Sequence, residues 1–435
     1  MKKYKLSILA VHSLGIVGFV LMSPVLPDVQ AEYPNAGSVA VQMLVTLPAI
    51  CSLVVGQISG WMSNFAEKRH LILIGLILFG AGGLGGYAAA EFWQLFLCRA
   101  LVGVGMGLFY PVNLSLVSDL FDGQERTAMI GCTMAANYFG GAIGTVVAGL
   151  LAAFSWRSVF LVNLYVVLVL GVCVFFLPSH KNNVQKAGRR YQLLPWRVYL
   201  LAAFAMAQML VFYSCVTNFA TCTQELGQTQ AVVASIGVAA LYIGCFLTGM
   251  ILVRLQTAMG AWLVPAAVAT MGLGFLGLAK ADHLLVLYAG IFLVGLGDGI
   301  IIPSIMARTA EVCPVIYSGQ AMATVNIGTS MGQFASPLFF AGVKLVLQAD
   351  TAQSGFEGVC ILLIALAVVL IVRTAAGSAR RRQGCRQGCK EPETCKPCSN
   401  ISRKWGWNTL RSNSMRALQH LSRRWSAVWR VAPAL

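Results

Sequence analysis

Apolar runs dominate this chain of 435 residues, and short polar segments separate them. A helix needs about 20 apolar residues to cross a bilayer. Lipid offers no partner for backbone polar groups, and continuous runs favour helices over the alternating strands of a barrel. We therefore expect an all-α polytopic membrane protein with twelve transmembrane helices, near residues 6–26, 38–62, 70–90, 92–117, 127–152, 157–177, 197–219, 231–254, 260–279, 284–306, 317–346 and 356–374.

One apolar stretch occurs twice. Leu101–Pro111 reads LVGVGMGLFYP and Leu293–Pro303 reads LVGLGDGIIIP, with six identities in eleven positions at an offset of 192. Two apolar helices could share glycines through composition alone, but the spacing of the other runs agrees with a duplication. Internal repeats of this kind are typical of secondary transporters. The repeat predicts two pseudo-symmetric six-helix halves, 1–177 and 197–374, joined by a polar, basic linker at 178–196.

Composition and charge support a membrane location. Hydrophobic residues make up 58% of the chain and charged residues 11%, which is too apolar for a soluble domain. Residues 1–374 carry 18 Lys and Arg, and 14 of these fall on one side of the predicted membrane against 3 on the other. Basic loops stay inside, so both termini are expected in the cytoplasm, at a bacterial plasma (inner) membrane. This topology explains the basic balance without a nucleic-acid partner.

A basic tail containing Cys and Trp follows at 375–435, with 13 Lys and Arg against 2 Asp and Glu. Its end could form an amphipathic helix on anionic membrane lipid, with the apolar positions Leu418, Leu421, Trp425 and Val428 on one face, or it could simply be solvated. Four tail cysteines are spaced too closely for a usual zinc module. We expect no metal and no cofactor.

Several segments resemble the major facilitator superfamily. GWMSNFAEKRHLIL is similar to the family's loop between helices 2 and 3, through Gly60, Lys68 and Arg69, with Asn64 where the family usually has Asp. Arg99 begins a match to the R-x-x-x-G-x-G pattern of helix 4. The resemblance implies two rocking six-helix bundles, and it implies that the loop motif Gly60, Asn64, Lys68 and Arg69 takes part in gating.

The fifth helix is similar to a glycine pattern of the drug–proton antiporter branch of that family. Gly131, Gly140 and Gly144 fit the pattern, Thr145 replaces its proline, and Gly149 ends it. This resemblance implies export of drug-like compounds in exchange for protons.

Two charged residues fall inside the apolar runs, where charge is costly unless it is paired or used. Arg99 lies in helix 4, on a stripe with Met106, Tyr110 and Asn113 that we expect to face a cavity between the halves. Asp298 lies near the middle of helix 10, and the repeat maps it onto Met106. A desolvated carboxylate suits reversible protonation. Asp298 is therefore a candidate for proton coupling, although a structural pairing with a neighbouring helix would explain it too. Arg99 resembles the family's helix-4 arginine, which implies a role in proton movement, although a packing and hydrogen-bonding anchor would also explain it.

Neutral polar residues in other runs are further candidates. His12 in helix 1 could titrate near neutral pH, or it could be a satisfied core histidine. The expected substrate cavity is lined by Met106, Tyr110, Asn113, Asn137, Gln208, Asn218, Asn326, Ser330 and Gln333. Polar side chains between membrane helices also serve as interhelical contacts, so both roles stay open.

No catalytic set and no phosphate-binding loop is present, so we do not expect an enzyme. The sequence favours a secondary active transporter, a proton-coupled exporter of small amphipathic or cationic compounds that works as a monomer by alternating access. A sugar or organic-acid importer or facilitator of the same fold is one alternative. A non-transporting membrane sensor or scaffold that acts through the tail is another.

Overall fold

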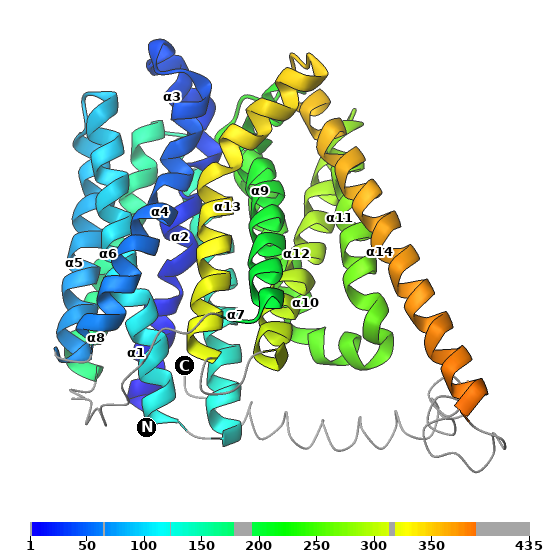
Figure 1. Cartoon of the computed structure of the whole chain (residues 1–435). Helices are drawn as coiled ribbons and strands as arrows, with labels where there is room; N and C mark the ends of the chain where they lie inside the picture. Colours follow the sequence, from blue (N-terminus) through cyan, green and yellow to red (C-terminus); the bar gives the residue numbers. More distant parts are fainter. Residues whose placement is uncertain (1, 64–65, 122, 178–193, 313–317, 389–435) are drawn as a thin grey trace. The chain divides into compact units, whose positions relative to one another are not determined.

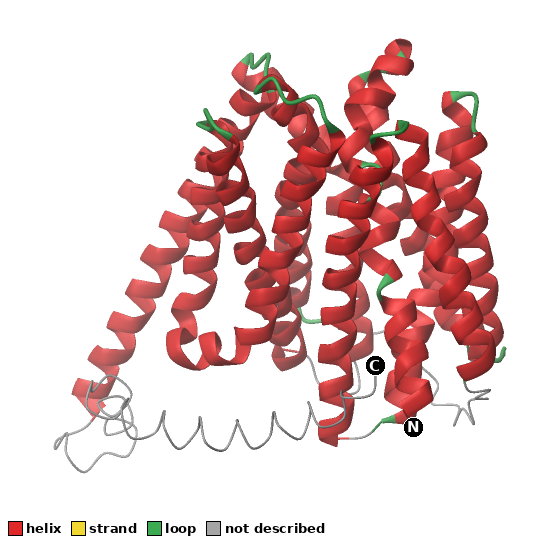
Figure 2. Ribbon diagram, turned by 180° about the vertical axis from the view of Figure 1, so that it is seen from behind, coloured by secondary structure: helices red, strands yellow, loops and turns green. Residues whose placement is uncertain are grey.

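The computed structural model describes residues 2–63, 66–121, 123–177, 194–312 and 318–388. Within these ranges the secondary structure is helical throughout (Figures 1 and 2). The helices before the predicted linker are α1 (Lys2–His12), α2 (Leu14–Val20), α3 (Leu26–Glu32), α4 (Ser38–Met62), α5 (Lys68–Ala88), α6 (Phe92–Leu120), α7 (Gly123–Ala152) and α8 (Tyr165–Phe176). Those after it are α9 (Trp196–Glu225), α10 (Ala231–Met259), α11 (Leu263–Ala279), α12 (Leu284–Val312), α13 (Ser318–Leu347) and α14 (Ala352–Gly388).

Eleven stretches of the described residues are long and apolar enough to cross a membrane. One of them, Ala231–Ala279, has 49 residues, far more than the roughly 20 that one crossing needs. It contains two helices, α10 and α11, with a 3-10 turn at Gly260–Trp262 between them. The protein is therefore an all-helical polytopic membrane protein, and these helices match the twelve expected runs.

The first span, Tyr4–Glu32, is interrupted twice. At the first break the Ser13 hydroxyl donates to the Ala10 carbonyl at 2.7 Å, a local bond that competes with the helical ladder. The second break is a 3-10 turn over Ser23–Val25, which includes Pro24. Pro24 explains the second break, because a proline inside a helix interrupts the hydrogen-bond ladder. The predicted run at 6–26 contained neither break.

The sequence repeat reappears as a repeat of helix contacts. A Cβ at Gly105 would lie 2.5 Å from the Phe79 backbone nitrogen, and one at Gly297 would lie 2.9 Å from Met271 Cβ. Both the glycines and their partners are related by the offset of 192. In each half the helix that carries the repeat therefore packs against the preceding helix at the same register. These pairs are α6 with α5 and α12 with α11. The glycines allow this because small residues let helix backbones approach closely.

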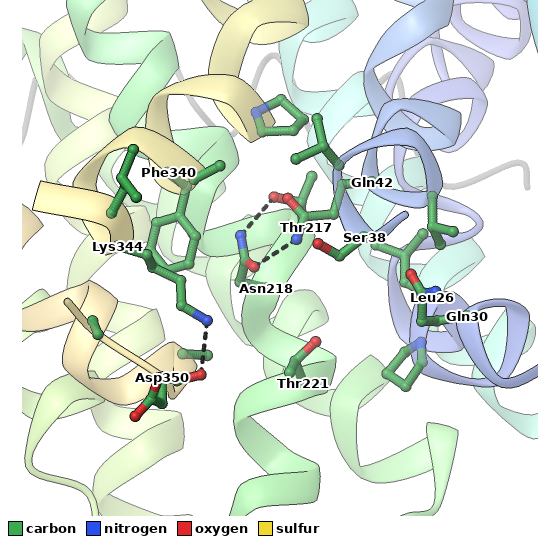
Figure 3. A pocket seen from close by; sticks show the side chains of 18 of the residues that line it. Leu26, Gln30, Ser38, Gln42, Thr217, Asn218, Thr221, Phe340, Lys344 and Asp350 are labelled. Carbon is green, nitrogen blue, oxygen red and sulfur yellow. Dashed lines mark hydrogen bonds between the residues drawn. The ribbon is translucent and has the colours of Figure 1, made fainter. Parts of the chain in front are cut away.

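Hydrogen bonds join helices on opposite sides of the predicted linker, near the side expected to face outward. Gln42 on α4 donates through Nε2 to Asn218 Oδ1 on α9 at 2.8 Å (Figure 3). The Ser23 hydroxyl donates to the Val216 carbonyl. Helix α7 also packs on α10, where a Cβ at Gly149 would lie 2.0 Å from Ser235 Oγ.

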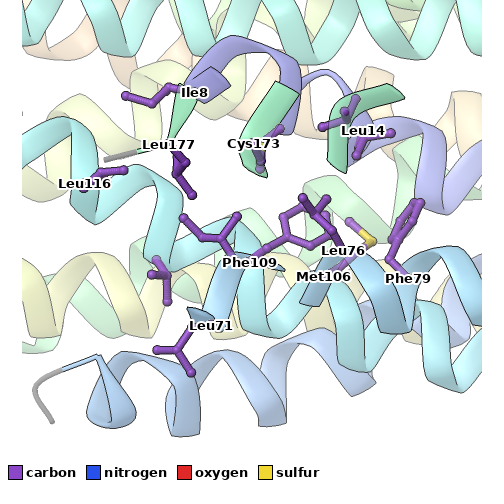
Figure 4. Packing of buried hydrophobic residues seen from close by; sticks show 14 of the residues in the cluster. Ile8, Leu14, Leu71, Leu76, Phe79, Met106, Phe109, Leu116, Cys173 and Leu177 are labelled. Atoms are coloured by element: carbon purple, nitrogen blue, oxygen red, sulfur yellow. The ribbon is translucent and has the colours of Figure 1, made fainter. Parts of the chain in front are cut away.

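An apolar core fills the space between the helices that precede the linker (Figure 4). It includes Leu76 and Phe79 from α5, Met106 and Phe109 from α6, and Cys173 from α8. Buried residues of α1 and α2 complete it, so this core joins α1, α2, α5, α6 and α8.

The last helix differs from expectation at its end. We expected the last membrane run to stop at 374, where the basic tail begins, but α14 continues to Gly388. The chain divides into a unit of residues 1–368 and a second unit that begins at Val369. The functional residues described below lie in the first unit. The side chains of the tail cysteines and the predicted amphipathic stretch lie outside the described residues.

Candidate functional site

Arg99 is buried between three helices, with 1% of its surface exposed. Its Nε donates to the Leu44 carbonyl at 2.6 Å, and an Nη donates to the carbonyls of Gly18 and Phe19 at 2.7 and 3.1 Å. Gly18 and Phe19 lie in the last turn of α2, where carbonyl oxygens lack helical donors. The guanidinium thus holds α6 against α2 and α4. It also supplies hydrogen-bond donors to the carbonyls at the end of α2, where the first span is interrupted.

The stripe that begins at Arg99 does not face the opposite half as expected. Met106 is 3% exposed and belongs to the core shared with Phe79 and Phe109. A Cβ at Gly18 would lie 2.6 Å from Met106 Sδ, so Met106 packs between α2 and α5. We expected this stripe to face a cavity between the halves, but the contacts of Arg99 and Met106 lie within the N-terminal set of helices.

Asp298 occupies the matching place on α12. It is 3% exposed, and Gln208 on α9 donates from Nε2 to Asp298 Oδ1 at 3.1 Å. The same Gln208 Nε2 lies 3.2 Å from Met271 Sδ on α11. Asp298 therefore lies between α9 and α11, as Met106 lies between α2 and α5. Among the described residues no cation pairs with this carboxylate.

Tyrosines that the sequence reading did not single out surround this region. Tyr213 on α9, Tyr242 on α10 and Tyr138 on α7 lie close enough to Asp298 for its charge to act on their hydroxyl groups. Tyr138 comes from the N-terminal set of helices, so the surroundings of Asp298 include residues from both sets. Their aromatic rings look like ordinary core residues in an apolar run, so no sequence signal marked them.

Four of the predicted residues form one polar cluster in the N-terminal set of helices. Asn113 Nδ2 lies 2.5 Å from His12 Nδ1 and 3.0 Å from the Ile8 carbonyl, and the rings of His12 and Tyr110 are 4.9 Å apart. Asn137 Nδ2 donates to the Tyr110 hydroxyl at 3.3 Å. Within the described chain, His12 Nε2 and Asn113 Oδ1 have no hydrogen-bond partner.

Asn137 also explains how the break in helix 1 is tolerated. Its Oδ1 accepts from the backbone nitrogen of Ile16 at 2.9 Å. Ile16 lies in the first turn of α2, where backbone N–H groups have no helical acceptor. The side chain of α7 thus caps the restarted helix, as an N-cap residue would do.

The glycines of the fifth-helix pattern have different surroundings. A Cβ at Gly140 would lie 2.2 Å from the Ser13 carbonyl oxygen, and one at Gly144 would lie 2.8 Å from Val17 Cγ2. Gly149 approaches α10 instead, whereas nothing described lies within 4 Å of a Cβ at Gly131. Three of the four glycines therefore permit close helix contacts, two of them with the broken first span.

The loop motif is held through Lys68, which is 1% exposed. Its Nζ donates to Ser115 Oγ at 2.5 Å and forms an ion pair with Asp119, both on α6. Arg69 donates to the Val174 carbonyl at 2.6 Å. A Cβ at Gly60 would have no described atom within 4 Å, and Asn64 lies outside the described residues. Asp119 was missed because the sequence reading ended this helix at 117.

The remaining candidates lie on α9 and α13. Asn218 is buried and donates to the Ser214 carbonyl at 2.9 Å, while it accepts from Gln42. Gln333 is buried, and its Nε2 has no partner among the described residues. Ser330 is half-buried and Asn326 is exposed. These polar residues do not form one cluster with Asp298 in the described contacts.

Comparison with known proteins defines the class to which this chain of membrane helices belongs. The family model "Major Facilitator Superfamily" matches residues 8–337. The chain belongs to this superfamily, so it is a secondary transporter and not an enzyme.

Individual relatives are distant. Puromycin resistance protein pur8 of Streptomyces alboniger is 28% identical over 178 residues, 40% of this chain and 35% of that protein. Multidrug transporter protein MdtP of Bacillus subtilis is 27% identical over 146 residues, 33% of this chain and 26% of that protein. The match thus spans about a third or less of these relatives.

A solved structure shares the fold. It is a bacterial homologue of the human lysosomal transporter Spinster, in an inward-facing and occupied conformation. The TM-score is 0.66 at 16% identity, over 85% of this chain and 94% of that one.

Proposed function

We propose that the protein exports small amphipathic or cationic compounds in exchange for protons, through alternating access of two six-helix halves, 1–177 and 197–374. The observation that carries this proposal is Asp298, a carboxylate buried in the middle of a membrane helix. Charge at this depth is costly, and such residues commonly mark substrate or proton pathways. Binding and release of a proton at Asp298 would link the pH gradient to the conformational change.

The hydrogen bonding of Asp298 supports this role. Its described partner is the neutral amide of Gln208, and no basic side chain in the described chain neutralises it. A permanent structural ion pair would instead hold the carboxylate in one charge state. A proton and a cationic substrate both carry positive charge, so they could bind to the Asp298 carboxylate alternately.

Export is supported by the names of two distant relatives, one a puromycin resistance protein and one a multidrug transporter. The close contacts of Gly140 and Gly144 with the first span support the same branch. We propose that Arg99 acts by positioning α2, and that His12 with Tyr110, Asn113 and Asn137 supplies a second polar region.

The distribution of Lys and Arg along the chain also supports a proposal for the location of the protein. We propose a bacterial inner membrane, with both termini in the cytoplasm and a monomer as the working unit. The distribution of Lys and Arg along the sequence supports this orientation.

The test is transport of puromycin by protein in vesicles with an imposed pH gradient. Asp298→Asn should abolish gradient-driven transport and leave gradient-independent exchange, because the amide has similar size but cannot take up a proton. Asp282→Asn is the matched control, since Asp282 is an exposed acid outside the spans. Unchanged gradient-driven transport by Asp298→Asn would refute the coupling role. Reversing the gradient separates export from import.

A further inference from the structure

A cavity of ≈ 630 Å³ lies between the two sets of helices, near the side expected to face outward. We call it the outer cavity. It lies apart from the region around Asp298, which does not line it. Its walls combine neutral polar, apolar and charged side chains, notably Gln30, Ser38, Gln42, Thr221, Phe340 and Lys344 (Figure 3).

One wall carries a positive charge. Lys344 on α13 donates from Nζ to the backbone carbonyl of Asp350 at 2.9 Å. Asp350 also lines this wall, but its side chain is exposed and no carboxylate among the described residues forms an ion pair with Lys344. An ammonium group bound to a neutral carbonyl keeps further donors for a carboxylate, and that charge-assisted bond is the stronger kind.

The opposite wall offers hydrogen-bond acceptors. The side-chain oxygens of Gln30 and Gln42 are buried and have no donor among the described residues. The orientation of the Gln42 amide is set by its neighbours. Asn218 Nδ2 donates to the Ser214 carbonyl, so Asn218 Oδ1 must accept from Gln42 Nε2, and Gln42 Oε1 is left over. A buried acceptor without a donor is unfavourable, so an N–H group in the cavity would be stabilised by either oxygen after a small side-chain shift.

We propose that the outer cavity binds a small amphipathic zwitterion, with its carboxylate on Lys344 and its ammonium group on the amide oxygens of Gln30 and Gln42. Figure 3 shows Lys344 on one side of the cavity and Gln30 with Gln42 on the other. Phe340 and Leu26 supply apolar surface for the body of the ligand. Amino acids and short peptides have this chemistry, and the site does not depend on proton coupling at Asp298.

The placement of the site gives such a ligand a second effect. Gln30 and Gln42 precede the predicted linker, whereas Lys344 follows it. A ligand held at both ends would connect α3 and α4 to α13, in addition to the hydrogen bond between Gln42 and Asn218. The bound zwitterion should therefore stabilise the arrangement in which the outer ends are together, since a ligand shifts an equilibrium toward the state that it binds more tightly.

The experiment measures binding of three probes to the purified full-length protein in lipid nanodiscs by titration calorimetry. L-phenylalanine carries both charges, phenylalaninamide lacks the carboxylate, and N-acetylphenylalanine lacks the ammonium group. We expect each of the two modified probes to bind about tenfold more weakly than L-phenylalanine, because one charge-assisted contact is lost.

Substitutions at two residues show which side chain binds which end of the ligand. Lys344→Gln keeps a donor for the Asp350 carbonyl but removes the charge. It should weaken L-phenylalanine about tenfold and leave phenylalaninamide unchanged, and Lys344→Arg should restore binding. Gln30→Met should weaken L-phenylalanine and leave N-acetylphenylalanine unchanged.

The control is Gln230→Met, at an exposed glutamine outside the cavity. It should bind all three probes as the unmodified protein does. Equal affinity for the three probes, or no binding of L-phenylalanine at millimolar concentration, would overturn the proposal.

Discussion

At the scale of single residues, the two buried charges are accommodated in different ways. Arg99 has three carbonyl acceptors on two other helices, all at helix positions fixed by the fold. Asp298 has one described donor, an amide on a flexible side chain. A guanidinium presents its donors in a rigid, planar fork that suits several fixed acceptors. Arg99 is therefore suited to holding structure, and Asp298 to changing its charge.

Arg99→Lys should lower stability although the charge is retained. A lysine has one ammonium group, which cannot reach carbonyls on both α2 and α4 with the same geometry. At least one buried carbonyl loses its donor, which costs about 1–3 kcal/mol. The melting temperature in detergent measures the effect, and Arg373→Lys, at an exposed position, is the control. A melting temperature equal to that of the control would contradict the positioning role.

Gln208→Leu should change the pH dependence of transport. The amide of Gln208 donates to Asp298, and a donor favours the ionised form of a carboxylate. Without this donor the ionised carboxylate is less stabilised, so the midpoint of the pH profile of transport should move to higher pH. Initial transport rates across a pH series test this. Gln333→Leu is the control, because Gln333 is also buried but has no described contact with Asp298. A shift to lower pH would contradict the assignment.

At the scale of helices, glycines determine how closely neighbours approach. The close contact of Gly140 is with backbone atoms of the broken first span, which cannot move aside as a flexible side chain can. Asn137, one turn away on the same helix, caps α2. Helix α7 thus supports the break in helix 1 through a close contact and a cap together.

Gly140→Ala should destabilise the protein, because the new Cβ would lie 2.2 Å from the Ser13 carbonyl oxygen. Overpacking of this kind costs about 1–3 kcal/mol. Gly131→Ala on the same helix is the matched control. Its Cβ would meet no described atom within 4 Å, and alanine favours a helix interior over glycine by about 1 kcal/mol. The melting temperatures of both variants measure the effect. Equal melting temperatures would contradict a tight contact between α7 and the first span at Gly140.

The helices and the repeat could be predicted because both depend on local patterns. The offset of 192 maps Asp298 onto Met106, and the glycines next to them have equivalent neighbours, Phe79 for Gly105 and Met271 for Gly297. The direction in which Met106 faces could not be predicted, since a buried stripe has the same period whichever neighbour covers it. The break at Ser13 has no proline to signal it. The contact between Gln42 and Asn218 joins residues 176 positions apart, so no local pattern contains it.

At the scale of the whole molecule, alternating access requires contacts between the halves that can form and break. The described hydrogen bonds from Gln42 to Asn218 and from Ser23 to Val216 lie near the side expected to face outward. Few strong bonds are involved, and each is neutral. A contact of this strength can be exchanged for water when the outer ends separate. These bonds therefore favour one state without fixing it.

Gln42→Leu should shift the population toward the state with separated outer ends. Leucine cannot donate to Asn218 Oδ1, and one neutral hydrogen bond contributes about 1 kcal/mol, which corresponds to about a fivefold change in the equilibrium. Spin labels at Asn35 and Thr229, two exposed positions on the side expected to face outward, would report the change as a larger share of long distances. Gln30→Leu is the control, because Gln30 has no described hydrogen bond to the other half and should leave the distribution unchanged. An identical distribution for Gln42→Leu would mean that the outer ends are held by packing of α7 on α10 and not by the polar contact.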